Sequence, residues 1–161
     1  MNDKVFYSWQ DFDEDIEILT NYIRNNKWIP NYIVGVKRGG LIPAIKLSHI
    51  FNKPLIMMSC QLRDSKDNEV RLYEVEQLPK NQHILIVDDI CDSGITLQKI
   101  VYQLHSDGFS NIKTCSLIYN FAQDFRIDYC AREIDRFQDN RWIIFPWEQE
   151  PNLRKKETRI V

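Results

Sequence analysis

The amino-acid sequence predicts an α/β fold, with one domain whose mostly parallel sheet is flanked by helices. Its 161 residues suit a single domain, at about 100–200 residues per domain. Apolar segments with the length of buried strands alternate with segments of helical periodicity, a pattern typical of a parallel sheet covered on both faces. No repeat or linker divides the chain. We therefore expect one domain over residues 1–150 and a polar, basic tail over residues 151–161.

The chain opens with a short strand and an amphipathic helix. Residues 5–7 have the character of a strand, and Ser8 followed by Asp11 forms a helix-capping pattern. Apolar side chains then recur every three or four residues, at Phe12, Ile16, Leu19 and Ile23. This spacing places them on one helical face and predicts a helix that follows the cap at Ser8 and runs to about Asn25.

The remaining elements follow the same alternation of strand and helix. Apolar runs predict strands at residues 32–36, 54–58, 83–87 and 112–119, with a late fifth strand at 142–145. Helical periodicity predicts helices at residues 41–52 and 96–106. The polar segment at residues 61–81 is long for a connection, and connections of this length are typically functional lids.

Composition excludes several classes of function. The net charge of −2 creates no positive electrostatic field that would attract nucleic acid, so we expect no nucleic-acid partner. The four cysteines contain no C-x-x-C pair and indicate neither a zinc site nor a disulfide framework. No apolar run approaches the ~20 residues of a membrane span, and the first residues lack a secretory leader pattern. We expect a protein of the reducing cytoplasm with no membrane partner.

The segment at residues 84–96 carries the chemistry. A buried strand ends in two adjacent carboxylates, Asp88 and Asp89, which suit sugar hydroxyls or a hydrated Mg²⁺. In open α/β sheets ligands bind beyond this end of the strands. A short loop then enters a helix, where backbone N–H groups and hydroxyls make a phosphate cradle. The cradle would consist of Asp92, Ser93, Gly94, Ile95 and Thr96.

Three alternatives for residues 84–96 fit the sequence less well. Two carboxylates that merely ended a strand would repel each other and a third acid at Asp92. A response-regulator receiver has its acidic pair after the first strand, whereas too few residues follow Asp89 here to complete such a domain. A nucleotide kinase would need G-x-x-x-x-G-K-[ST], which is absent from the sequence.

Residues 84–96 resemble the 5-phosphoribosyl-1-pyrophosphate (PRPP) motif of the type I phosphoribosyltransferases at every position. Residues 36–41, VKRGGL, resemble the pyrophosphate loop of that family. Residues 141–148, RWIIFPWE, resemble the C-terminal hood of the bacterial and archaeal xanthine-guanine and hypoxanthine phosphoribosyltransferases. The resemblance covers roughly residues 5–150 and implies the type I phosphoribosyltransferase fold with a small C-terminal hood.

The resemblance implies a purine phosphoribosyltransferase of purine salvage, a glycosyltransferase that joins PRPP to guanine, xanthine or hypoxanthine. The products are a nucleoside 5′-monophosphate and pyrophosphate, Mg²⁺ is the cofactor, and we expect a homodimer or homotetramer. Asp88 and Asp89 would bind the ribose hydroxyls and the metal, and residues 92–96 would bind the 5′-phosphate. Asp92 would also be the general base that takes the purine N7 proton.

The other site residues are implied in the same way. Lys37, Arg38 and Gly39 would bind pyrophosphate. The family often has a non-proline cis peptide bond in this loop, and the bond between Lys37 and Arg38 is the candidate for it. Trp142 would stack on the base, Ile143 would offer it backbone groups, and Glu148 would help to coordinate Mg²⁺.

Two positions depart from the family pattern. Related 6-oxopurine enzymes have a lysine at the end of the fourth strand, where Asn120 stands here, and we expect Asn120 to face the base. An asparagine amide both donates and accepts hydrogen bonds, so it weakens a preference for oxo groups. The polar segment also begins SCQL, at residues 59–62, where relatives have a Ser-Tyr pair. Two alternatives stay open: an enzyme for adenine or a modified base, and a non-catalytic regulator that binds PRPP or nucleotides.

Overall fold

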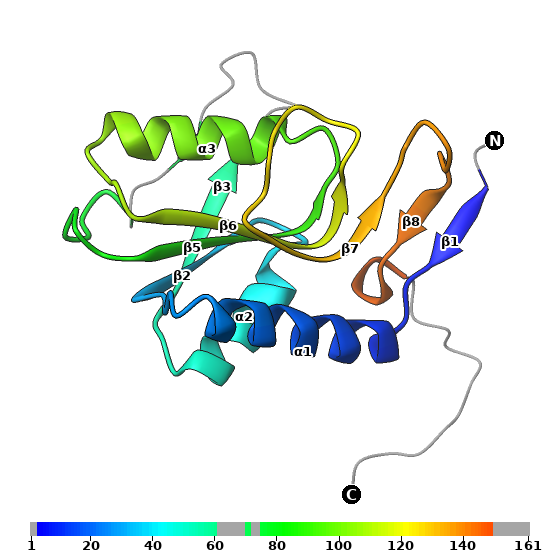
Figure 1. Cartoon of the computed structure of the whole chain (residues 1–161), viewed down its shortest axis with the longest axis horizontal. Coiled ribbons are helices and arrows are strands. Elements are labelled where there is room, and N and C mark those ends of the chain that lie inside the picture. Colours follow the sequence, from blue (N-terminus) through cyan, green and yellow to red (C-terminus); the bar gives the residue numbers. More distant parts are fainter. Residues whose placement is uncertain (1–2, 61–69, 72–74, 150–161) are drawn as a thin grey trace, which may run out of the picture.

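The computed structural model describes residues 3–60, 70–71 and 75–149. Its main sheet has six strands in the order β4-β3-β2-β5-β6-β7 (Figure 1). These strands are β2 (Tyr32–Val36), β3 (Leu55–Cys60), β4 (Val70–Arg71), β5 (Ile84–Cys91), β6 (Ile112–Asn120) and β7 (Tyr129–Ile134). Every pairing is parallel except that of the edge strand β4 with β3. The predicted α/β fold with a mostly parallel sheet is therefore confirmed.

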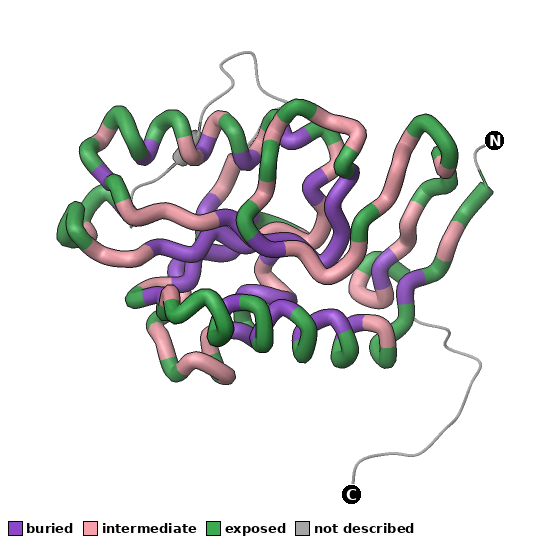
Figure 2. The backbone as a smooth tube through the Cα atoms, in the orientation of Figure 1, coloured by how far each residue is buried: buried purple, intermediate pink, exposed green. Residues whose placement is uncertain are grey.

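Helices cover both faces of the sheet. The helices α1 (Trp9–Asn25) and α2 (Leu41–Phe51) lie on one face, and α3 (Ile95–Ser106) lies on the other (Figure 1). Successive residues of a strand point to opposite faces. Leu85 and Val87 of β5 accordingly join the core under α1 and α2, whereas Ile84 and Ile86 join the core under α3. The buried residues in Figure 2 follow the middle of this sheet.

The first helix begins as its capping pattern predicts. The amide of Asp11 donates to Ser8 Oγ at 3.0 Å, and the amide of Ser8 donates to Asp11 Oδ2 at 2.8 Å. This reciprocal pairing satisfies two of the free N–H groups of the first turn. The four apolar residues that predicted the helix are all buried against the sheet: Phe12, Ile16, Leu19 and Ile23.

The late strand that we expected at residues 142–145 does not follow the fourth strand in the main sheet. It is β8 (Trp142–Ile144), which pairs in parallel with β1 (Lys4–Phe6) in a separate two-stranded sheet. A short 3₁₀ helix, Pro146–Glu148, completes this hood. The place beside β6 belongs to β7, whose mixed sequence YCAREI gave no apolar run. Strand pairing depends on distant residues, so an apolar run alone could not assign β8 to its sheet.

Other limits of the prediction concern the polar segment and the tail. Within residues 61–81, the structure has strand β4 and then turns from residue 75 to residue 81; the rest lies outside the described residues. The tail at 151–161 also lies outside them. Among the described helices, none has the length and apolar character needed to cross a membrane.

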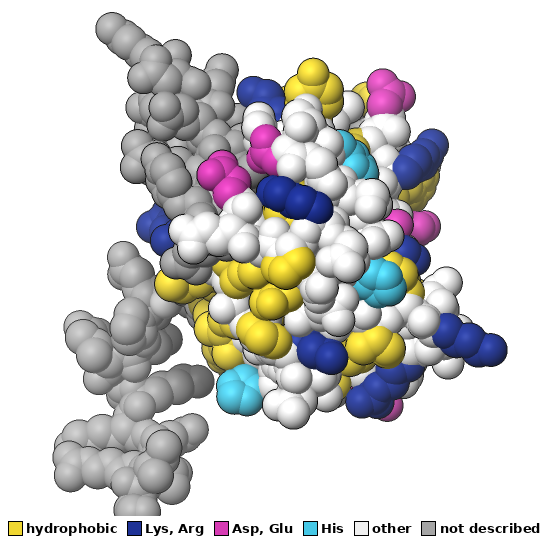
Figure 3. All heavy atoms as spheres, turned by 90° about the vertical axis from the view of Figure 1, so that its left-hand side faces the viewer, with side chains coloured by type: hydrophobic (Ala, Val, Ile, Leu, Met, Phe, Trp, Pro, Cys, Tyr) yellow, Lys and Arg dark blue, Asp and Glu magenta, His cyan; other side chains and the backbone are white. Residues whose placement is uncertain are grey.

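The N-terminal ends of the strands are closed by side-chain packing. The Trp28 ring stacks on His83 with centroids 5.0 Å apart, and Lys113 Nζ lies 5.3 Å from the Trp28 centroid. Figure 3 shows this end of the molecule, where hydrophobic side chains gather among scattered Lys and Arg. The carboxyl ends of the strands lie at the opposite end of the sheet, where ligands bind in open α/β folds.

Candidate active site

A cavity of about 220 Å³ lies at the carboxyl end of β5. The β2–β5 pairing runs as far as Gly35 and Val87, whereas β5 pairs with β6 as far as Cys91 and Tyr119. The last half of β5 therefore extends past β2 and presents its side chains to the cavity. The lining comprises residues 88–94, Thr96, Leu97, Arg136, Trp142, Ile143, Phe145 and Glu148. The structure thus brings the predicted PRPP motif and the predicted hood residues to one cavity.

The loop at residues 92–94 turns sharply from β5 into α3 at Gly94. Its φ of 74° is in the left-handed region, and a Cβ built there would lie 2.5 Å from Cβ of Phe125. Glycine is the residue that satisfies both constraints. The helix α3 starts at Ile95, and Thr96 and Leu97 of its first turn line the cavity. The N–H groups of a first helical turn are the donors that an anion site uses.

The acidic pair occupies an environment that disfavours negative charge. Burial and the neighbouring Asp89 charge raise the pKa of Asp88 well above its usual value. Burial also raises the pKa of Asp89, and the charge of Glu148 adds to this effect. One oxygen of each carboxyl accepts a backbone hydrogen bond. Oδ1 of Asp88 accepts from the amide of Asp89 at 3.0 Å, and Oδ1 of Asp89 accepts from the amide of Ile90 at 2.9 Å. Hydroxyl donors or a cation from a ligand would relieve the remaining cost.

The loop between β2 and α2 lies against this acidic pair. The peptide bond between Lys37 and Arg38 is cis, as the resemblance implied. A Cβ built on Gly39 would lie 1.7 Å from Oδ2 of Asp89, so the backbone touches the carboxylate. The side chains of Lys37 and Arg38 are exposed and do not line the cavity. Their role toward pyrophosphate remains a prediction.

Asp92 is held from behind by two side chains. Its Oδ1 accepts hydrogen bonds from Asn120 Nδ2 at 3.2 Å and from Arg136 Nε at 3.1 Å. The side chain of Asp92 is 46% exposed and that of Arg136 is 18% exposed. Among the described residues, Oδ2 of Asp92 has no hydrogen-bond partner, which leaves it available to a ligand.

Asn120 does not occupy the position that we expected for a base-reading residue. It is 1% exposed and is not part of the cavity lining. Its Oδ1 accepts from the amides of Ala122 at 3.2 Å and Arg136 at 3.3 Å, while its Nδ2 donates to Asp92. The structure therefore places Asn120 behind Asp92, where it positions the carboxylate.

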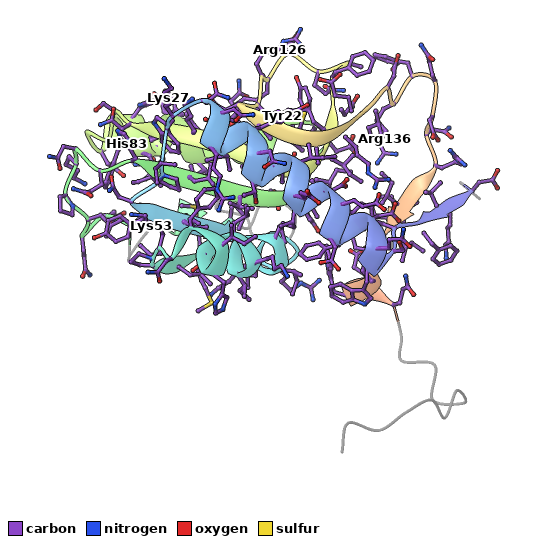
Figure 4. The ribbon with its side chains drawn as sticks, turned by 60° about the horizontal axis from the view of Figure 1, so that its bottom comes forward. Tyr22, Lys27, Lys53, His83, Arg126 and Arg136 are labelled. Carbon is purple, nitrogen blue, oxygen red and sulfur yellow. The ribbon has the colours of Figure 1, made fainter. Side chains whose placement is uncertain are left out.

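Arg136 is a charged cavity residue that sequence analysis missed. It follows the end of β7 on the way to the hood (Figure 4). Its contact with Asp92 joins residues 44 positions apart, so no local pattern indicated it. Recognition of β7 would have supplied the signal, because that strand sends the following residues to the same sheet edge.

The hood supplies the apolar wall. Trp142 is 53% exposed and lines the cavity with Ile143, so its ring is free to stack on a flat ligand. Trp147 lies elsewhere, with its ring stacked on Phe145 at a centroid distance of 4.8 Å. It is partly buried and packs against the core under α1 and α2.

Glu148 lines the cavity, but its Oε2 accepts a hydrogen bond from the Phe145 amide at 3.0 Å. Among the described residues, no three side chains of the metal-binding types form a preformed metal site. The carboxylate oxygens that are present could supply part of a Mg²⁺ coordination shell. Mg²⁺ is commonly held by one or two carboxylates plus substrate phosphates, and Asp88 and Asp89 are such donors.

A strand that delivers two carboxylates beside the loop at a helix N-terminus is an arrangement typical of α/β proteins that bind phosphorylated ligands. The aromatic wall opposite that loop adds a place for a flat ring. The chain belongs to the phosphoribosyl transferase domain family, whose profile matches residues 6–152. The predicted family and the type I phosphoribosyltransferase fold are thereby confirmed.

Individual relatives agree with this assignment. A purine phosphoribosyltransferase from Pyrococcus horikoshii has a similar structure, with a TM-score of 0.74 and 31% identity over 96% of this chain and 99% of that one. The xanthine-guanine phosphoribosyltransferase of Idiomarina loihiensis is 27% identical over 120 residues, which cover 72% of this chain and 70% of the relative. The uracil phosphoribosyltransferase of Mycoplasmopsis pulmonis is 27% identical over 124 residues. That match covers 70% of this chain but 59% of the relative, less than two thirds of its length.

Proposed function

We propose that this protein transfers the 5-phosphoribosyl group of PRPP to a 6-oxopurine base, namely guanine, xanthine or hypoxanthine, in purine salvage. One observation carries the proposal. A single cavity brings together the phosphate loop, the acidic pair, the carboxylate of Asp92 and the exposed ring of Trp142. These are a cradle for phosphate, acceptors for ribose hydroxyls, a proton acceptor and a platform for the base.

The binding roles follow from the chemistry of each group. The phosphate loop, residues 92–96, holds the 5′-phosphate through its N–H groups and hydroxyls. Asp88 and Asp89 accept the ribose hydroxyl hydrogens and so gain the donors that their buried carboxylates lack. Trp142 and the backbone of Ile143 hold the base in plane. Lys37, Arg38 and Gly39 contact the pyrophosphate. The contact of Gly39 with Asp89 supports this role, because it places the loop next to the carboxylates that bind the ribose.

The reaction exchanges one bond at C1′ of the ribose for another. The C1′–oxygen bond breaks and its electron pair leaves with pyrophosphate, while N9 of the base forms the new bond. The ribose carries positive charge during the exchange, and the nearby carboxylates stabilise it. Asp92 takes the proton that the base loses from N7, and its unpartnered Oδ2 is the acceptor. Asn120 and Arg136 hold Oδ1 and fix the carboxylate for this transfer.

The family implies Mg²⁺, and the carboxylates of Asp88 and Asp89 are the residues that would hold it, with Glu148 nearby. When bound with the substrate, Mg²⁺ neutralises the charge that accumulates on pyrophosphate. We also propose a cytoplasmic homodimer or homotetramer, as is usual for soluble salvage enzymes of one domain.

The test is incubation of the protein with PRPP, Mg²⁺ and one base at a time, with nucleotide formation measured by chromatography. Hypoxanthine, guanine and xanthine should react, whereas adenine and uracil serve as the comparison bases. Preferred use of adenine would support the alternative enzyme, and preferred use of uracil would match the Mycoplasmopsis pulmonis relative. PRPP binding without turnover of any base would indicate a regulator and would refute the proposal.

A further inference from the structure

Arg136 presents an unused hydrogen-bond donor to the cavity. Its Nε donates to Oδ1 of Asp92, and its Nη1 donates to the backbone carbonyl of Arg141. These two contacts orient the planar guanidinium. Among the described residues, its Nη2 has no partner, although the side chain is 18% exposed and lines the cavity. A ligand in the cavity that carries an acceptor would satisfy this donor.

The unused donor of Arg136 and the unused acceptor of Asp92 belong to one side-chain pair. The two side chains are joined through Nε and Oδ1 at 3.1 Å, and Nη2 and Oδ2 are the donor and the acceptor that remain. A 6-oxopurine protonated at N7 presents the complementary pair on one edge, an acceptor at O6 beside a donor at N7. Arginine is also the commonest partner of this edge in nucleic-acid recognition, where it donates to O6.

We infer that Arg136 donates to the 6-oxo group of the base and thereby determines specificity. The inference rests on the proposed function and names the residue that selects its substrate. Asn120 cannot take this part, because its donor atom, Nδ2, already donates to Asp92 and the residue lies outside the cavity lining.

The chemistry of the guanidinium gives the direction of the preference. Arginine carries donors and no acceptor, so it pairs with a carbonyl and not with an amino group. A 6-aminopurine would set its own N–H groups against the guanidinium and leave both unpaired in a buried site. Sites built around such a hydrogen bond reject mismatched analogues strongly. The neutral amide of Asn120 therefore does not weaken the preference for oxo groups.

The experiment compares kcat/KM for hypoxanthine and adenine in wild type, Arg136→Met and Arg136→Lys. Arg136→Met keeps an unbranched apolar stem that ends near the position of Nε and removes the donors. We expect its kcat/KM for hypoxanthine to fall about 10²-fold or more, and the ratio of hypoxanthine to adenine to fall at least about tenfold. Arg136→Lys returns a donor and should recover much of that ratio.

Two matched variants separate specificity from positioning. Asn120→Ala removes the other support of Asp92 and should lower kcat/KM for both bases by the same factor, with the ratio unchanged. Arg24→Gln changes an exposed arginine of α1, whose guanidinium lies over the Phe51 ring, and should leave activity and ratio unchanged. Thermal unfolding checks that each variant is folded.

Equal losses for both bases in Arg136→Met would overturn the inference, because Arg136 would then act through Asp92 alone. Unchanged activity would overturn it as well. Binding of inosine and adenosine 5′-monophosphates, followed by tryptophan fluorescence, is the second readout and does not need turnover. A wild type that preferred the inosine nucleotide but converted no base would refute the proposed function. In that case, loss of the preference in Arg136→Met would still support the role of Arg136, and its retention would refute it.

Discussion

Replacement of Gly39 by alanine tests whether the pyrophosphate loop controls the acidic pair. The new Cβ would lie 1.7 Å from Oδ2 and 2.4 Å from Cγ of Asp89, far closer than atoms can approach. The φ of Gly39 is not in the left-handed region, so alanine meets no backbone strain. The carboxyl group is the end of a side chain and can rotate away. We therefore expect a folded protein in which the Asp89 carboxylate is displaced from its place beside the cavity.

The neighbouring Gly40 provides the matched control. A Cβ at Gly40 would lie 2.5 Å from the Val87 carbonyl oxygen, 2.7 Å from Cα of Asp88 and 2.8 Å from the Val36 carbonyl oxygen. All three atoms belong to the backbone of central strands, which cannot rotate away. Overpacking of this kind typically costs about 1–3 kcal/mol, and we expect the upper end here. For a chain of this size, about 3 kcal/mol corresponds to a fall in Tm of roughly 6–12 °C.

The assay measures Tm by circular dichroism and kcat/KM for PRPP with hypoxanthine at saturating concentration. Gly39→Ala should keep Tm within about 2 °C of wild type and lose about 10²-fold or more in kcat/KM, because a misplaced site group costs that much. Gly40→Ala should instead show the fall in Tm given above. Full activity in Gly39→Ala would refute the argument that Asp89 must hold its present position. A fall in the Tm of Gly39→Ala equal to that of Gly40→Ala would show that the Asp89 side chain cannot rotate away from the new Cβ.

Three further predictions concern single side chains of the cavity. Asp92→Asn should lower kcat by about 10²–10⁴-fold with little change in PRPP affinity, and wild-type turnover would remove Asp92 as the base. Asp88→Asn should abolish PRPP use yet raise Tm at neutral pH. The pKa of Asp88 is raised in the folded protein, so the stability that its carboxyl contributes is complete below the unfolded-state pKa and is lost as pH rises through the folded-state pKa. The neutral amide does not incur that loss. The gain in Tm, measured without Mg²⁺ or PRPP, should shrink as pH falls toward about 4, and a gain independent of pH would contradict this reasoning. Trp142→Leu should raise KM for the base more than KM for PRPP, whereas equal effects would mean that the ring does not stack on the base.

The local features of this protein could be predicted from its sequence. The capping pair Ser8 and Asp11, the buried face of α1 and the turn at Gly94 depend on residues close together in the chain. The same is true of the strand that carries Asp88 and Asp89 into a helix start. Each follows from periodicity, capping or backbone freedom, which act over a few residues.

Only the tertiary structure decided which distant segments meet. The strand β8 has the apolar character of a sheet strand, but its partner is β1 at the other end of the chain. The order of the main sheet, with β7 beside β6, likewise depends on packing that no local pattern records. Pairing energy comes from the partner strand, so the sequence of one strand does not specify it.

The side chains that contact Asp92 were decided in the same way. From the sequence, Asn120 stood at the position expected to read the base, and nothing indicated Arg136. The fold buries Asn120 behind Asp92 and brings Arg136 from beyond β7 to the cavity, 44 residues from its partner. Residue types and their order were sufficient to predict the reaction family. The direction in which each side chain faces was not, because strand register and the path of the chain after β7 determine it.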